Sequence, residues 1–512
     1  MDCVQRVVFK GKIKTMSKLL YDTNDWTFER LRIVEDAIKE IAVEELKLNT
    51  YSNQIEIIGS DQMLDAYSSN GLPLMYNHWS FGKHFIQQNN SYRKGYSGLA
   101  YEIVINSNPC ISYLMEENSM TMQTLVIAHA AYGHNHFFKN NYLFKQWTDA
   151  DGILDYLNFA KKYINQCEER YGSEIVERTL DACHAVMNYG VNKYKRPGKP
   201  NKKRELEQQQ QREEYVQKQA NVLWSTLPKN KENKIASLEN KPFPAEPEEN
   251  ILYFLEKHSP KLESWQREIC RIVRKISQYF YPQRQTKLMN EGWASFVHYY
   301  IMNRLWEKGQ ISDGSYLEFI HSHSGVLNQL NYNHKYYHGF NPYALGFAMF
   351  SDIRRICTEP TREDEELFPH MIGKNWLDTC LDAVENFRDE SFVLQFLSPE
   401  VIRRWRLFEV EDLESEDFYF INNIQDSRGF NNIRHGLSSY YSLANMQPNI
   451  QIVDANLKTT RKLELQYIGV NNKKLTASRD RVLKHIEFLW GYDVSIRNDS
   501  INSNTQQYML FF

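Results

Sequence analysis

Apolar side chains that recur at helical spacing over long stretches are the feature that most limits how this chain folds. The stretches 25–46, 117–129, 158–194, 262–280 and 290–306 show this spacing with few interruptions. Only 22 Gly and 15 Pro occur in 512 residues, so the helices contain few breakers. Because Tyr (32) and Phe (27) are abundant, we expect aromatic side chains to dominate the core. The pattern predicts a mainly α-helical body and argues against a repeat-rich β-protein.

Short alternating segments add two β regions to this helical body. Near the N-terminus, residues 53–60 and 101–105 alternate as strands do and predict a small ribbon. The last hundred residues follow the order β-α-β-β-α-β of a ferredoxin-like α/β domain. Its predicted elements are strand 417–424, helix 431–444, strands 448–457 and 462–470, helix 477–491 and strand 492–498.

A change in composition at residues 196–250 divides the helical body. This segment contains KKRELEQQQQREEY and KPFPAEPEEN, which are typical of a solvated charged helix flanked by extended linker. It therefore predicts a boundary between two helical domains, the second of which packs on the first. The predicted domains are an N-terminal extension 1–18, a helical domain 19–195, a charged linker or helix 196–250, a helical domain 251–411 and a ferredoxin-like α/β domain 412–512.

Charge, cysteine usage and hydropathy restrict the class of protein further. With 61 basic and 64 acidic residues, the formal charge is −3, which gives no whole-chain signature for nucleic acid or an anionic membrane. The seven cysteines are spread singly, so they indicate a reducing compartment rather than a disulfide framework. No apolar run approaches the ~20 residues of a membrane span. The first residues also lack the apolar core of a signal peptide. We expect a soluble, cytoplasmic protein.

The densest cluster of metal-ligand side chains is the segment His129-Ala-Ala-Tyr-Gly-His134-Asn-His136. Imidazole and carboxylate are ordinary ligands of catalytic zinc or iron. At about 100° per residue, His129 and His136 lie roughly 20° apart on a helix, whereas His134 lies about 140° from His129. A kink or helix end at Gly133 would bring His134 back. The HExxH zinc motif is absent, because position 130 is Ala.

A second cluster lies in the segment NEGWASFVH. Glu291 and His298 are seven residues apart and share one helical face. A helix that carries Glu and His inward, beside a helix that carries histidines, is how bundles build metal sites. A single buried histidine is more often a hydrogen-bonded core residue, but the crowding of His and Glu in these two segments favours a metal site. The HSH sequence at His321 and His323 is a weaker candidate for lining a pocket.

These motifs resemble the SpoVR family (stage V sporulation protein R-like). The resemblance extends over about residues 19–497 and includes GLAYEIVINSNPC, DACHAVMNYGVNKYKRP and NPYALGFAMF. The family patterns are HAxxGHNxFF and NEGWAxFxHY, and His136 falls on an unspecified position of the first. The matching positions are His129, His134 and Asn135 in the first pattern, and Glu291, Trp293 and His298 in the second.

The resemblance implies a cytoplasmic bacterial protein. In spore formers the family is linked to the peptidoglycan cortex of the spore. In other bacteria, relatives often accompany a PrkA-type serine kinase and a von Willebrand-like protein in stress responses. The segment EGWA beside a helix with two histidines is also similar to some uncharacterised zinc-peptidase-like families.

Two hypotheses about function follow. The first is a metal-dependent hydrolase of peptide or amide bonds, acting on a peptidoglycan-related substrate. In this hypothesis, zinc or another divalent metal has the ligands His129, His134 and Glu291. His298 is either a fourth ligand or a partner behind the ligands. The general base is Glu117 or Glu116. The second is a non-enzymatic regulatory or scaffold protein of the sporulation or stress programme, whose tail and charged 196–250 segment bind partners such as the kinase.

Overall fold

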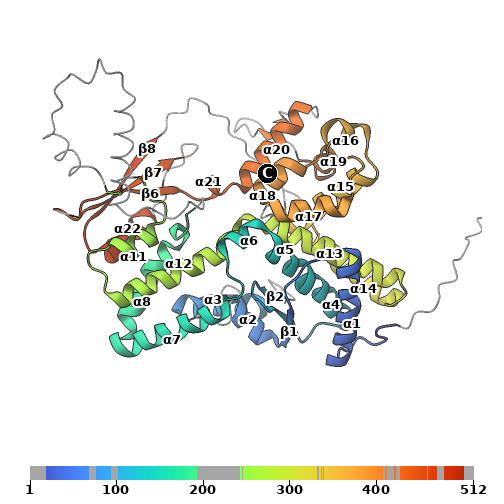
Figure 1. Ribbon diagram of the computed structural model, residues 1–512, viewed down its shortest axis with the longest axis horizontal. Helices are drawn as coiled ribbons and strands as arrows, with labels where there is room; N and C mark the ends of the chain where they lie inside the picture. Colours follow the sequence, from blue (N-terminus) through green and yellow to red (C-terminus); the bar gives the residue numbers. More distant parts are fainter. Residues whose placement is uncertain are drawn as a thin grey trace, which may run out of the picture. The chain divides into compact units, whose positions relative to one another are not determined.

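The computed structural model describes most of the helical body and the C-terminal sheet (Figure 1). The described residues are 19–68, 76–93, 102–192, 243–244, 246–330, 334–335, 337, 339–407, 410–411, 420–421, 427–457, 459–469, 475 and 478–500. The chain divides by its contacts into two compact units. The first comprises 1–166, 279–446 and 507–512, and the second comprises 167–278 and 447–506. The five predicted domains are consecutive stretches rather than contact units, and their boundaries stay a prediction.

The first unit is mainly helical, as predicted. Its elements in the N-terminal half are α1 (Phe28–Glu40), the π-helix η1 (Ile41–Glu45), β1 (Asn53–Ile58), α2 (Ser60–Ser68), α3 (Trp79–Arg93), β2 (Glu102–Ile105), β3 (Cys110–Met115), α4 (Met120–Ile127), the π-helix η2 (Ala128–His134), α5 (Asn135–Asn140), α6 (Tyr142–Trp147) and the first part of α7 (Ile153–Tyr171). From residue 279 they are the end of α12 (Ser264–Gln285), α13 (Lys287–Glu307), α14 (Asp313–Val326), α15 (Pro342–Thr358), α16 (Arg362–Leu367), α17 (Trp376–Asn386), α18 (Asp389–Phe396), α19 (Pro399–Trp405), β4 (Val410–Glu411), β5 (Phe420–Ile421), α20 (Ser427–Tyr441) and α21 (Leu443–Met446).

The small N-terminal sheet has the strand order β1-β3-β2. Both predicted ribbon strands are present, but they do not pair with each other, because β3 lies between them. β3 runs parallel to β1 and antiparallel to β2, so Ser112 lies opposite both Ile55 and Val104. The sheet therefore places Glu102, the first residue of β2, opposite Leu114 near the end of β3. A short turn connects β3 to α4.

The second unit contains the C-terminal α/β structure. Its three-stranded sheet has the order β6-β7-β8, and α22 connects the parallel pair β7 and β8 (Figure 1). Its elements are the end of α7, α8 (Ser173–Ala185), the 3-10 turn η3 (Met187–Tyr189), α11 (Ile251–His258), most of α12, β6 (Asn449–Ala455), β7 (Leu463–Gly469), α22 (Arg479–Trp490) and β8 (Val494–Ser500).

The predicted first strand and first helix of the tail have other partners. β5, inside predicted strand 417–424, pairs with β4. The helix predicted at 431–444 is α20, which belongs to the first unit and packs on α18. The physical reason is hydrophobic: Phe430, Ile433 and Leu437 of α20 are buried in the large core of that unit.

Helix α13 lies at the centre of the first unit, and glycines let two neighbours approach it closely. A Cβ on Gly133 of η2 would lie 2.6 Å from the Cα of Ala294. A Cβ on Gly292 would lie 2.4 Å from the Cα of Gly346 in α15. The N-terminus of α13 is capped by a residue distant in sequence, since Asp389 accepts hydrogen bonds from the backbone amides of Leu288 and Met289. The close packing holds η2, α13 and α15 in one compact group.

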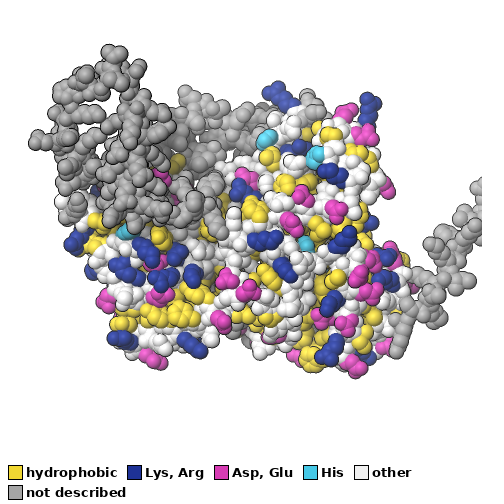
Figure 2. Space-filling view, viewed as in Figure 1, with side chains coloured by type: hydrophobic (Ala, Val, Ile, Leu, Met, Phe, Trp, Pro, Cys, Tyr) yellow, Lys and Arg dark blue, Asp and Glu magenta, His cyan; other side chains and the backbone are white. Residues whose placement is uncertain are grey.

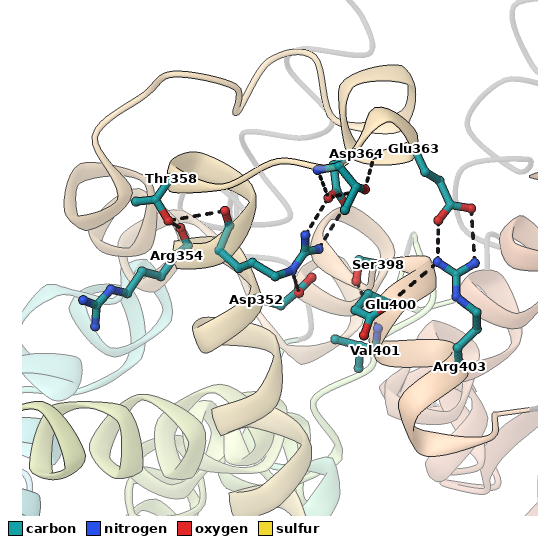
Figure 3. Close-up of polar contacts among 11 residues, drawn as sticks. Asp352, Arg354, Thr358, Glu363, Asp364, Ser398, Glu400, Val401 and Arg403 are labelled. Atoms are coloured by element: carbon teal, nitrogen blue, oxygen red, sulfur yellow. Dashed lines mark hydrogen bonds and ion pairs between the residues drawn. The ribbon is translucent and has the colours of Figure 1, made fainter. Parts of the chain in front are cut away.

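An ion-pair network connects α15, α16 and α19 in the same unit (Figure 3). Arg355 of α15 contacts Asp352 at 2.7 Å and Asp364 of α16 at 2.6 Å. Arg403 of α19 contacts Glu363 at 2.5 Å. These pairs join the short helices α16 and α19 to each other, and α16 to the long helix α15.

The surface charges, the hydropathy of the helices and the state of the cysteines complete the description of the fold. Figure 2 shows acidic and basic side chains intermingled over most of the described part of one face. Within the described ranges, no helix is long and apolar enough to cross a membrane. The described cysteines are all free and buried.

Candidate metal centre

The π-helix η2 turns His129 and His134 toward the same side. In a π-helix the backbone bonds from residue i to residue i+5, so side chains five apart lie one above the other. The two imidazole rings are 4.6 Å apart between centroids, and both residues are buried. The angle of about 140° that regular α-helical geometry predicts does not apply here. A full π-helical turn that begins at Ala128 brings His134 beside His129, rather than a kink or helix end at Gly133.

Two carboxylates from different elements face these histidines. Oε2 of Glu291, on α13, lies 3.5 Å from Nε2 of His134 and 3.9 Å from Nε2 of His129. Oε1 of Glu102, on β2, lies 3.4 Å from Nε2 of His129. Glu102 was not among the predicted site residues. The one signal for it in the sequence is an acidic residue at the start of the apolar strand EIVI.

The separations of these atoms suit a small divalent cation. Ligand bonds of about 2.0–2.2 Å place tetrahedral donor atoms roughly 3.3–3.6 Å apart. The donor atoms of Glu102, His129 and His134 all lie within 4.8 Å of one another. In the described part of the chain, the buried Oε2 of Glu291 has no hydrogen-bond partner. A buried carboxylate oxygen without a partner costs stability unless a cation or a donor satisfies it.

His298 lies behind His129, on the side away from the carboxylates. Its Nδ1 is 2.8 Å from Nδ1 of His129, whereas the carboxylates face Nε2 of His129. Nε2 of His298 is 2.8 Å from Nδ1 of His323, which is also buried. The geometry therefore favours the second of the two roles predicted for His298, a partner that orients His129.

Asn290 plays a corresponding role for His134. Its Oδ1 lies 2.9 Å from Nδ1 of His134. An amide oxygen can only accept a hydrogen bond, so Nδ1 of His134 donates and Nε2 presents its lone pair toward Glu291. This fixed tautomer is the one that can bind a metal through Nε2.

Burial and neighbouring charges shift the pKa values of the cluster in different directions, and the contacts of Glu291 with His129, His134 and Tyr343 outweigh burial and lower its pKa. Burial lowers the pKa of His134 to about 4, so this imidazole is neutral. Burial also acts to lower the pKa of His129, but the carboxylates of Glu102 and Glu291 outweigh it and raise the pKa. Burial raises the pKa of Glu102 despite the nearby His129. The neutral imidazole of His134, the imidazole of His129 and two carboxylates thus form a donor set that suits a cation.

The structure does not bring Glu116 and Glu117 to the cluster. Both are exposed in the turn between β3 and α4. Oε1 of Glu117 accepts a hydrogen bond from the backbone of Ser60 at 3.3 Å. The nine residues from Met120 to His129 rise by about 13 Å along a helix, which separates residues that are close in sequence. The general-base role predicted for these glutamates thus has no geometric support, while Glu102 is nearer.

His136 also points elsewhere. Its Nδ1 accepts a hydrogen bond from Nε1 of Trp293 at 3.2 Å, and burial lowers its pKa to about 3. The π-helical turn changes the phase of η2, so the α-helical alignment of His136 with His129 is lost. His136 is thus a neutral residue of the core.

A cavity of about 600 Å³ adjoins the cluster. His129, His298 and Glu102 line it, and so does Tyr343 at the start of α15, whose ring stacks on that of His129 with 6.2 Å between centroids. The volume lies within the range of small-molecule sites, roughly 300–1,000 Å³. The carboxylate of Glu102 is therefore accessible to a molecule in the cavity.

The fold and site define a helical protein with a buried His/Glu cluster beside a cavity. The model of the SpoVR like protein family matches residues 25–446, and that of the SpoVR-like C-terminal domain matches residues 448–500. The chain thus belongs to the SpoVR family. It is 55% identical over 481 residues to the uncharacterized protein YcgB of Escherichia coli K12, and the match covers 94% of each chain. No solved structure matches it significantly.

Proposed function

We propose that this chain is a divalent-metal-dependent hydrolase of peptide or amide bonds, with zinc as the candidate metal. The observation that carries the proposal is the convergence of Glu102, His129, His134 and Glu291 beside a cavity, together with the unpartnered Oε2 of Glu291. Nitrogen and oxygen donors from three protein side chains, with one position left for water, form the usual arrangement of a catalytic zinc site.

In this proposal each residue has one task. His129, His134 and Glu291 hold the metal, which supplies an acidified water and polarises the substrate carbonyl when bound. Glu102 lines the cavity and faces His129, so its Oε1 accepts the proton of the attacking water. Glu102 thereby replaces Glu116 and Glu117 as the proposed base. His298 and Asn290 keep the imidazole rings of His129 and His134 in the orientation that binding needs.

Metal content tests the proposal directly. The full chain is stripped with a chelator, dialysed against Zn²⁺, Mn²⁺ or Fe²⁺, and analysed for metal per chain. We expect about one ion in the wild type and in the exposed-histidine control His370→Ala, and loss of the ion in His129→Ala and Glu291→Gln. Glu102→Gln should keep the metal and lose activity. A wild type that binds none of these ions would overturn the proposal and favour the regulatory or scaffold alternative.

The setting of the activity is proposed from the family resemblance. It is the bacterial cytoplasm, with a peptidoglycan-related substrate, in sporulation or in a stress programme that involves a PrkA-type kinase and a von Willebrand-like protein. Purification of the tagged chain from stressed cells tests the partners: enrichment of the kinase over an untagged control supports them, and its absence counts against them.

A further inference from the structure

Lys287 is the cationic side chain nearest to the metal centre along α13. It lies four residues before Glu291, one helical turn away and on the same face. It lines the 600 Å³ cavity, and among the described residues around that cavity it is the only lysine or arginine. No carboxylate in the described part of the chain pairs with its ammonium group.

Two amide side chains of the cavity wall are already committed. The amide of Asn341 donates to the backbone oxygens of Val326 and Asn328, and its oxygen caps α15. The amide of Gln329 donates to backbone oxygens, and its oxygen accepts from the amide of residue 341. These side chains hold the cavity wall together, so they offer little to a ligand. Lys287 is the charged group that remains available.

Much of the wall is apolar. Met122, Leu125 and Val126 of α4 line one part, and Phe340 lines another. An apolar cavity with a single uncommitted cation recognises a molecule with a hydrocarbon portion and one anionic group. Glu102 and Glu291 place their carboxylates beside His129 at the proposed metal centre. An anionic group of a ligand therefore binds more favourably near Lys287 than near these carboxylates.

We propose that the substrate is a peptide or amide that carries a carboxylate, and that Lys287 binds this carboxylate. The inference rests on the proposed function, because the scissile amide must lie at the metal centre. Four residues of helix separate Lys287 from Glu291 by about 6 Å along the axis. The carboxylate therefore lies about five bonds from the reacting carbonyl, between the three bonds that separate the last amide carbonyl of an α-peptide from its C-terminal carboxylate and the six bonds for the preceding amide.

Two hydroxamates of equal length test this. Adipic acid monohydroxamate carries a carboxylate five bonds from its metal-binding carbonyl, and hexanohydroxamic acid carries a methyl group there instead. Their dissociation constants are measured by titration calorimetry on the zinc-loaded full chain. We expect the wild type to bind the carboxylate-bearing probe about 5-fold tighter or more, the range of one partly exposed ion pair. Lys287→Gln should equalise the two probes, and Lys287→Glu should reverse the preference.

The controls separate the two proposals. Lys374→Gln removes an exposed lysine that does not line the cavity, and it should keep the wild-type preference. Lys287 is itself exposed, so its variants should fold, which thermal melts confirm. Equal binding of both probes by the wild type would overturn the carboxylate proposal and leave the metal centre intact. Failure of both probes to bind the wild type would overturn the metal centre, and this inference with it.

Discussion

Glu291, whose side chain is 17% exposed, and the buried Asp364 are two carboxylates of the first unit with different surroundings. Asp364 receives two hydrogen bonds from Arg355, at 2.6 and 3.1 Å, and two more from Thr361 (Figure 3). Glu291 faces imidazole nitrogens of His134 and His129, at 3.5 and 3.9 Å, and its Oε2 has no hydrogen-bond partner among the described residues. Burial acts to raise the pKa of Glu291, but contacts with His129, His134 and Tyr343 outweigh it and lower the pKa. The chain thus supplies an arginine for Asp364, whereas Glu291 has histidines and a tyrosine beside it.

The difference separates a structural carboxylate from a candidate ligand. A buried ion pair that is complete holds elements together, and removal of one partner leaves an uncompensated charge. A buried carboxylate that is incomplete destabilises the protein until a ligand completes it. Neutralising Asp364 should therefore cost the metal-free protein more stability than neutralising Glu291.

Neutralising Asp364 should have the largest effect on stability. In Asp364→Asn, Arg355 loses its main partner, and we expect the free energy of unfolding to fall by about 3 kcal/mol. Urea denaturation measures the change. The matched control is Glu366→Gln, which breaks the exposed pair between Glu366 and Arg362 and should cost less than about 0.5 kcal/mol. Equal effects of the two changes would show that burial of the pair is irrelevant.

Neutralising Glu291 should act on the metal-bound protein. With chelator, Glu291→Gln should lose no more than about 1–2 kcal/mol, because only the contacts with His129, His134 and Tyr343 that lower the pKa of Glu291 are weakened. With metal at a hundred times the wild-type dissociation constant, the wild type should gain about 2.7 kcal/mol and the variant much less. Thermal melts with and without chelator measure the stability of the metal-free protein and the stabilisation that the metal adds. A chelator-insensitive wild type and a strongly destabilised variant would mark Glu291 as structural.

Separating η2 from α13 should weaken both packing and binding. In Gly133→Ala the new Cβ would lie 2.6 Å from the Cα of Ala294, so the helices must move apart. We expect a loss of about 1–3 kcal/mol in unfolding free energy and a weaker metal affinity. Gly325→Ala, where a Cβ meets nothing within 4 Å, is the control and should leave both quantities nearly unchanged. Unchanged affinity in Gly133→Ala would show that the close approach does not position the histidines.

The pH dependence of the free energy of unfolding should distinguish Asp364 from another buried carboxylate, Asp389. Burial acts to raise the pKa of Asp364, but Arg355 and Thr361 outweigh it and lower the pKa. Its contribution to stability is thus present above pH ~4 and lost as the pH falls through the lowered pKa. Burial raises the pKa of Asp389 to about 7, against the backbone hydrogen bonds. Its contribution is present below pH ~4 and lost as the pH rises toward 7.

Comparison of two variants with the wild type across pH measures this contrast. The destabilisation caused by Asp364→Asn should shrink below pH 4, whereas that caused by Asp389→Asn should shrink between about pH 4 and pH 7. Each slope should be at most about 1.4 kcal/mol per pH unit, the limit for one proton. Parallel pH profiles for the two variants would contradict the assignment of opposite environments.

Much of the architecture was predictable from local sequence. Helical periodicity and the scarcity of Gly and Pro predict helices such as α4 and α13. These signals depend on residues within a turn or two of each other, so no tertiary information is needed. The seven-residue spacing of Glu291 and His298 likewise predicts their shared face on α13, and the structure places both at the cluster.

Only the tertiary structure decided which atoms meet. The π-helical turn of η2, which packs through Gly133 against Ala294, places His134 beside His129, although regular helical spacing separates them. The sheet brings in Glu102, while Glu116 and Glu117 stay in an exposed turn despite their position close to the histidines in sequence. Sequence spacing fixes the direction of a side chain only while the helix stays regular and only within one element. The convergence of β2, η2 and α13 depends on packing between elements distant in sequence, and that packing determines the site.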